Sequence, residues 1–289
     1  KPLWPARYSA ERLETIRQEM VHNPGAYNRT YLSDSHDEST ARCKQEFIDS
    51  CLKRAREVGA YGVPGSRCED FLPYYGRRPD GTVGPGENFF TITGIDLAFR
   101  VEEQHDLSCM FTYECNRPDG LYRVVDVDYG HWDALTVANK AIDKALRYNS
   151  VLAVEAVGGQ SFMIDMIRDK LTRPVQNAHG QSVGYELLKH VQVYPMMTSQ
   201  AAKANPSYGV ESLFYEMARG SWLFPNKAGV VRREMAQFIR DCREYEPSRH
   251  VSDLLMACFL ARWKATDWAM LGRPMPQSAG GGVGSVLMR

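Results

Sequence analysis

The sequence lacks the long hydrophobic segments that define membrane and secreted proteins. Its longest apolar run, residues 254–261, is far shorter than the ~20 residues that a transmembrane helix needs. Residues 1–10 contain no apolar core of signal-peptide length. We therefore expect a soluble protein of the cytoplasm that does not bind membranes.

Paired cysteines are also missing. The seven cysteines are an odd number, they are scattered along the chain, and no two of them form a CxxC pair. Disulfide scaffolds and structural zinc sites need paired or closely spaced cysteines, so the sequence argues against both. A cysteine inside an apolar segment, such as Cys258, is expected to be a small core residue.

The chain carries no excess of charge of either sign. Its 35 Lys and Arg residues balance 35 Asp and Glu residues, which excludes a generally basic protein that coats nucleic acid. A local basic face could still contact phosphates. With 44% hydrophobic and 24% charged residues, the composition is that of a folded protein and not of a disordered chain. The phosphate-binding loop G-x-x-x-x-G-K-[ST] is absent, because no glycine is followed directly by a lysine.

Turn-forming residues divide the chain into segments. Residues 1–61 are expected to form a small helical segment that is too poor in apolar residues to build its own core. Residues 62–87 are rich in Gly and Pro and are expected to be a linker. Residues 88–270 have the pattern of one α/β domain, and residues 271–289, with their run of glycines, are expected to be a flexible tail.

The order of elements within the α/β domain predicts its fold. Five segments have the alternation or the apolar content of strands: 89–97, 107–115, 121–128, 150–155 and 190–194. Helices separate the later strands, and three more are expected at about 207–219, 230–244 and 249–270. This order predicts a mixed β-sheet, with three antiparallel strands followed by parallel additions, covered by helices.

Three acidic residues interrupt segments that are otherwise apolar. Asp96 lies near the end of the first strand, and Glu155 ends the strand at 150–155. Asp253 begins an apolar helix, with His250 just before it. Carboxylates seldom lie beside buried elements unless they are paired or bind a cation, and strand ends are where ligand sites gather in α/β sheets.

Such a cluster has a chemical use. Mg²⁺ and Mn²⁺ prefer hard oxygen ligands, and two such ions about 3.5–4 Å apart can activate a water and stabilise the leaving oxygen of a phosphodiester. Each acid also has a simpler interpretation. Asp96 could be a turn residue, and Glu155 and Asp253 could be acids at helix N-termini, where the dipole favours them. His250 alone could be a surface or capping residue.

Short motifs, taken in order, resemble the C-terminal nuclease domain of phage large terminase subunits, which has the RNase H-like fold. The motifs are Gly94-Ile95-Asp96, the segment Ala153 to Gly159, Lys203 followed by a helix and the segment Ala218 to Pro225, and His250 to Ala257. Each motif is short, so their order and spacing carry the resemblance. More weakly, residues 1–60 look like the end of the family's ATPase region and its linker.

The resemblance implies a metal-dependent endonuclease that cleaves concatemeric double-stranded DNA during viral genome packaging. It implies that Asp96 bridges two Mg²⁺ or Mn²⁺ ions, with Glu155 on one, Asp253 on the other and His250 near a metal. The implied partners are DNA, the terminase ATPase domain, the small terminase subunit and the portal. Since the phosphate-binding loop is absent, we expect a nuclease with the tail of the ATPase region, without ATPase activity, in the host cytoplasm.

Other charged residues have less specific interpretations. Asp126 and Asp128 share one strand face, which we expect to be solvated. The candidate phosphate contacts are Lys203, Arg219, Lys227, Arg232 and Arg233. For any single one of them, solvated surface charge is the simpler interpretation. Two other functions stay open at this point: another RNase H-like nuclease, such as a junction resolvase, and a non-catalytic module that docks on the portal or on neighbouring subunits.

Overall fold

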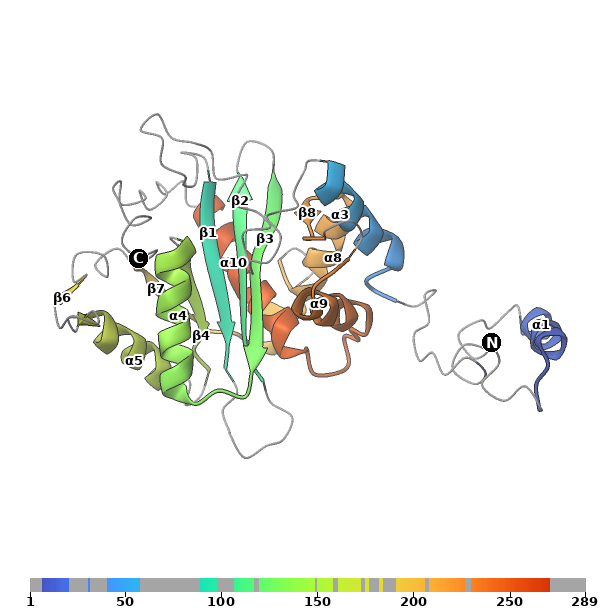
Figure 1. Ribbon diagram of the computed structural model, residues 1–289, viewed down its shortest axis with the longest axis horizontal. Coiled ribbons are helices and arrows are strands. Elements are labelled where there is room, and N and C mark those ends of the chain that lie inside the picture. Colours follow the sequence, from blue (N-terminus) through green and yellow to red (C-terminus); the bar gives the residue numbers. More distant parts are fainter. Residues whose placement is uncertain are drawn as a thin grey trace.

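The computed structural model (Figure 1) describes most of the chain. The described residues are 7–20, 31, 41–57, 89–97, 107–116, 120–148, 150–157, 161–172, 175–176, 182–183, 191–205, 208–226 and 230–270. The predicted Gly/Pro-rich linker at 62–87 and the predicted tail at 271–289 lie outside this part of the chain.

Six strands form one mixed sheet in the order β7-β4-β1-β2-β3-β8. Their bounds are β1 (Phe89–Asp96), β2 (Ser108–Asn116), β3 (Leu121–Gly130), β4 (Ser150–Glu155), β7 (Val193–Met196) and β8 (Trp222–Leu223). The strands β1, β2 and β3 pair antiparallel, whereas β4 joins β1, β7 joins β4 and β8 joins β3 in parallel. The predicted α/β class and the predicted mixed sheet, with three antiparallel strands and parallel additions, are confirmed. A separate two-stranded sheet pairs β5 (Val175–Gln176) with β6 (Ser182–Val183).

Helices precede, cover and follow the sheet. Their bounds are α1 (Ala10–Glu19), α3 (Gln45–Glu57), α4 (Ala134–Tyr148), α5 (Ser161–Thr172), α7 (Gln200–Lys203), α8 (Val210–Ala218), α9 (Arg233–Arg243) and α10 (Asp253–Met270). Within the described ranges, none of these helices has the length and apolarity that a membrane span requires.

One predicted strand is shifted along the chain. The strand predicted at 190–194 is β7 at 193–196, because its pairing with β4 sets Met196 opposite Glu155. The helix expected at about 249–270 begins at Asp253, the acid predicted to begin it, and Ser252 caps it: the Ser252 hydroxyl oxygen accepts a hydrogen bond from the Leu255 N–H (3.3 Å). The short helix α7 was not predicted, since a few residues show no periodicity. Strand β8 lies in the segment Ala218 to Pro225, which belongs to the motifs of the resemblance.

The two faces of the sheet carry separate hydrophobic cores, because successive side chains of a strand point to opposite faces. On one face, Ile92, Phe111 and Trp222 pack with residues of α8, α9 and α10. On the other face, Ile95 and Leu152 pack with residues of α4 and α5. The sheet is therefore covered on both sides, with α10 on the face opposite to α4.

Helix α10 approaches β1 at backbone distance. A Cβ atom on Gly94 would lie 1.9 Å from the carbonyl oxygen of Ala257 and 2.8 Å from the backbone nitrogen of Ala261. No real side chain tolerates such distances, so only glycine fits at this position of β1. Ala257 and Ala261 are one helical turn apart and present the smallest side chain with a Cβ, which lets the helix lie flat on the strand.

Helix α3 shares the core of the α/β domain. Its residues Ile48 and Cys51 are fully buried in the cluster that includes α8, α9 and α10. Asn226, just after β8, donates its side-chain N–H to the Leu52 carbonyl (2.9 Å) and accepts a hydrogen bond from Arg56 (2.9 Å). This part of the N-terminal segment, which was expected to lack a core of its own, is thus stabilised by the sheet domain.

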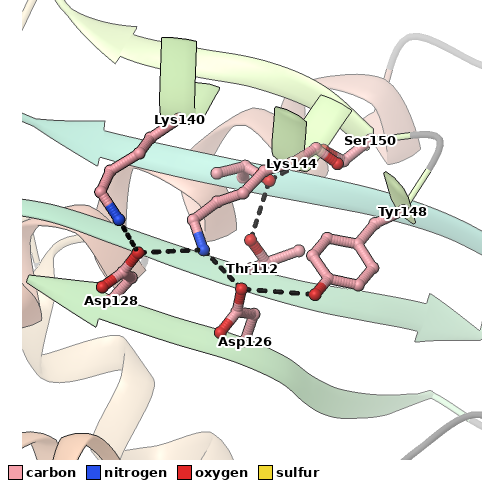
Figure 2. A network of polar contacts seen from close by, with 8 residues as sticks. Thr112, Asp126, Asp128, Lys140, Lys144, Tyr148 and Ser150 are labelled. Carbon is pink, nitrogen blue, oxygen red and sulfur yellow. Dashed lines mark hydrogen bonds and ion pairs between the residues drawn. The ribbon is translucent and has the colours of Figure 1, made fainter. Parts of the chain in front are cut away.

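The expectation that Asp126 and Asp128 face solvent was wrong, because α4 covers that face of the sheet (Figure 2). Lys144, only 4% exposed, makes a short ion pair with the Asp126 carboxylate, which also accepts a hydrogen bond from the Tyr148 hydroxyl (3.4 Å). The Lys140 ammonium lies 2.9 Å from Asp128, and Lys144 lies 3.7 Å from the same carboxylate. The acids of β3 are therefore neutralised by lysines of α4.

Replacing Gly94 with Ala should destabilise the fold strongly. The added Cβ must push the α10 backbone away from β1, so we expect the free energy of unfolding in urea to fall by about 3 kcal/mol or more. Gly120→Ala is the matched control: nothing lies within 4 Å of its added Cβ, and only its positive φ of 64° opposes the change. That strain should cost about 1–2 kcal/mol. Equal losses in the two variants would contradict the close packing of α10.

Replacing Lys144 with Met should also destabilise the protein, because it leaves the buried Asp126 carboxylate without its cation. We expect a loss of about 3–5 kcal/mol in urea unfolding. Lys140→Met is the control: the Lys140 side chain is 31% exposed, so solvent screens its pair with Asp128 and the loss should stay below about 1 kcal/mol. Adding Asp126→Asn to Lys144→Met should recover part of the loss. A Lys144→Met variant as stable as the wild type would rule out this role.

Candidate active site

The sheet brings Asp96 and Glu155 together at one edge. The strands β1 and β4 are parallel neighbours, and their register pairs Ile95 with Val154, so the next residues, Asp96 and Glu155, end the two strands side by side. Both acids are buried, with 6% and 7% of their surface exposed. The parallel pairing thus places two carboxylates with little access to water in direct proximity.

Helix α10 supplies the third acid. Asp253 is its first residue and lies one turn before Ala257, the residue that contacts Gly94. Gly94 and Asp96 point to the same face of β1, because they are two residues apart on a strand. The contact that fixes α10 on Gly94 therefore also directs Asp253 toward Asp96. The Leu107 N–H, just before β2, donates to the Asp253 carboxylate (3.0 Å) and the Leu97 N–H donates to that of Asp96 (2.9 Å).

The electrostatics of the site reflect this convergence. Burial raises the pKa of Asp96 well above its ordinary value; the contact with Glu155 and the charges of Glu155 and Asp253 raise it further, and Lys203 opposes them. Cys109 pairs with Asp96 across β1 and β2, and burial followed by the charges of Asp253 and Asp96 raises the pKa of its thiol. The negative charges of acids from β1, β4 and α10 therefore converge at this end of the sheet.

Glu155 has partners that follow β7. The Thr198 hydroxyl donates a short hydrogen bond to Oε1 of Glu155, and the Lys203 ammonium lies 3.7 Å from the same oxygen. Of the basic residues predicted to contact phosphates, Lys203 thus lies at the end of the sheet where Asp96 and Glu155 meet. Thr198 was missed, because a single threonine after a strand has no pattern that distinguishes it from a surface residue.

The remaining candidates lie elsewhere or outside the described residues. His250 is exposed in the turn before α10. Arg219 is exposed at the end of α8, and Arg232 lies beside the middle of β3, two strands away from β1. Arg233 is the exposed first residue of α9, and Lys227 falls outside the described ranges.

A second residue that the sequence did not reveal links α9 to the start of α10. The Asp241 carboxylate accepts hydrogen bonds from the side chains of Gln237 (2.7 Å) and Ser252, the residue that caps α10. Burial raises the pKa of Asp241, and its charge adds to that of the other acids at Cys109. Asp241 thereby connects the helix end that carries Asp253 to a neighbouring helix.

The donor chemistry of this edge fits a hard divalent cation. Its acids offer carboxylate oxygens, which Mg²⁺ and Mn²⁺ prefer, and a cation beside Asp96 and Glu155 would relieve the repulsion between two buried negative charges. Within the described part of the chain, no group of three His, Cys, Asp or Glu side chains is already arranged so that it could hold a metal ion. The fit is therefore one of donor type and charge.

Comparisons with known proteins give similarities of fold at low sequence identity. No family model matches the chain, and no curated protein matches it. The Mn-soaked, inhibitor-bound terminase nuclease domain of human cytomegalovirus is similar at 11% identity and a TM-score of 0.47, over 80% of this chain and 97% of that chain. The large terminase nuclease domain of Thermus phage P74-26 has 11% identity and a TM-score of 0.41, over 74% and 91%. The zinc-bound large terminase nuclease of thermophilic phage G20c has 13% identity and a TM-score of 0.39, over 60% and 80%.

Proposed function

We propose that the chain is a divalent-metal-dependent endonuclease that cleaves double-stranded DNA, as the nuclease part of a viral genome-packaging terminase. The observation that carries the proposal is the meeting of Asp96 and Glu155 at one sheet edge, with Asp253 directed toward them by α10. The order of the sequence motifs around these three residues supports the terminase assignment, and the α/β sheet supports it as the fold that the motifs imply.

The three acids would hold the cations. Asp96 and Glu155 would hold one divalent ion, and Asp96 and Asp253 a second, which together would activate a water and stabilise the leaving oxygen. The chain's own groups prepare this site. Backbone N–H groups fix the carboxylates of Asp96 and Asp253, and burial of Asp96 and Glu155 keeps bulk water from competing for the oxygens.

Lys203 is the candidate contact for the scissile phosphate. Its ammonium lies beside Glu155, and its side chain is 21% exposed, so it is held at the site and still reachable from solvent. A phosphate that enters beside the carboxylates meets this positive charge. Recognition through phosphate charge carries no base sequence, so we propose that DNA is bound largely through its backbone.

Replacing Asp96 or Asp253 with Asn should abolish DNA cleavage and leave the fold intact. Each change removes a negatively charged ligand, and metal ions contribute several kcal/mol to such reactions, so we expect a loss of about 100-fold or more. The measurement is nicking and linearisation of supercoiled plasmid in Mn²⁺ or Mg²⁺, with chelator as the metal-free reference. Asp143→Asn, which changes an exposed acid of α4, is the matched control and should cut like the wild type.

The same assay separates the alternatives. Plasmid cleavage by Asp96→Asn at the wild-type rate would show that the site is assigned wrongly. A wild-type protein that cuts four-way junctions and leaves linear duplex intact would be a junction resolvase. A wild-type protein that neither binds Mn²⁺ nor cuts any DNA would favour the docking module.

The raised pKa of Asp96 should appear in the pH dependence of stability. Because the pKa of Asp96 is raised in the folded state, the metal-free wild type should lose stability as pH rises above the ordinary aspartate pKa of 3.8, and Asp96→Asn should lose less.

Metal binding should also appear in the stability of the protein. At neutral pH, saturating Mn²⁺ should raise the melting temperature of the wild type, and Mn²⁺ at 100 times Kd should add about 2.7 kcal/mol to the free energy of unfolding. The Asp96→Asn variant should show a much smaller shift. Equal Mn²⁺ shifts in both proteins would argue against binding at Asp96.

A further inference from the structure

We infer that Thr198 is a positioning residue that fixes the orientation of the Glu155 carboxylate, an inference that rests on the proposed metal-dependent function. Thr198 follows β7 by two residues, and Met196 at the end of β7 pairs with Glu155. The pairing brings the Thr198 hydroxyl to Oε1 of Glu155, where it donates a short hydrogen bond.

Glu155 receives a hydrogen bond of a different kind from those described for the other two acids. Asp96 and Asp253 receive hydrogen bonds from the backbone N–H groups of Leu97 and Leu107, and no substitution other than proline removes a backbone donor. Glu155 has one more rotatable bond than an aspartate, and the hydrogen bond from Thr198 comes from a side chain. A substitution of Thr198 can therefore remove this hydrogen bond and test what it contributes.

The contact also opposes a specific repulsion. Glu155 lies against Asp96 with little solvent around either acid, so two like charges would drive the longer side chain away. Thr198 and Lys203 both engage Oε1 of Glu155. Lys203 supplies charge from a long flexible stem, whereas the hydroxyl of a β-branched residue supplies a directed donor with few rotamers. Of the two groups at Oε1, Thr198 is thus the one that supplies a directed contact.

The neighbouring residue shows that Thr198 does not serve the helix that follows. Helix α7 is capped by Ser199, whose hydroxyl oxygen accepts a hydrogen bond from the Ala202 N–H (3.1 Å). Adjacent hydroxyl residues therefore have different tasks: Ser199 stabilises the start of α7, and Thr198 holds Glu155. This division supplies a matched control one residue away.

The experiment compares the full chain carrying Thr198→Val, Thr198→Ser or Ser199→Ala with the wild type. Mn²⁺ affinity is measured by calorimetric titration without DNA, and cleavage is measured on plasmid in single-turnover conditions. We expect Thr198→Val to weaken Mn²⁺ binding and slow cleavage by about 10–100-fold, as is typical for residues that orient metal ligands. Thr198→Ser, which keeps the hydroxyl, should restore both to within a few-fold, and Ser199→Ala should change the melting temperature without changing Mn²⁺ affinity.

Three results would overturn the inference. In the first, Thr198→Val binds Mn²⁺ and cuts like the wild type. In the second, Ser199→Ala weakens Mn²⁺ binding as much as Thr198→Val, which would mean that only local structure matters. In the third, the wild type itself neither binds Mn²⁺ nor cuts, which removes the proposed function along with the role of Thr198. If Thr198→Val does not melt cooperatively, Thr198→Ala takes its place with the same expected losses.

Discussion

The backbone contact between β1 and α10 is the constraint on which the site depends. Gly94 has no Cβ, so the helix lies on the strand with the Ala257 carbonyl directly against it. Asp253 lies one helical turn before Ala257, and Asp96 lies two residues after Gly94, so the contact brings the two acids toward each other. The same packing that closes the hydrophobic core therefore assembles acids that are far apart in the sequence, and core and site cannot be varied independently here.

The sequence alone allowed most strands and helices of the sheet domain to be predicted, because each has a clear local period. The strand ending at Glu155 was predicted with the observed bounds, since an apolar run between turn signals leaves little freedom. The burial of Asp126 could not be predicted in this way. Alternation shows that two residues share a face, but it does not show that a helix carrying Lys144 covers that face. Likewise, the role of Thr198 depends on the pairing of β7 with β4, which only the fold reveals.

Acids are buried on both faces of this sheet, in contrasting surroundings. On the α4 face, the ammonium groups of Lys140 and Lys144 lie against Asp126 and Asp128 and occupy the place that a cation would take. On the α10 face, Asp96 contacts another acid, Glu155, and burial together with this contact raises the pKa of Asp96. Buried carboxylates that are paired with lysines contribute to the stability of the fold. Buried carboxylates that lie against each other are suited to bind a cation from solution.

The docking of α3 has a consequence for where the folded unit begins. Helix α3 ends at Glu57 and β1 begins at Phe89, and both elements belong to one hydrophobic core. A chain shortened so that it starts at β1 would lose Ile48 and Cys51, which are fully buried in that core. The apolar surface that they cover beside α8 and α9 would then be open to water. The folded unit therefore includes α3 as well as the sheet.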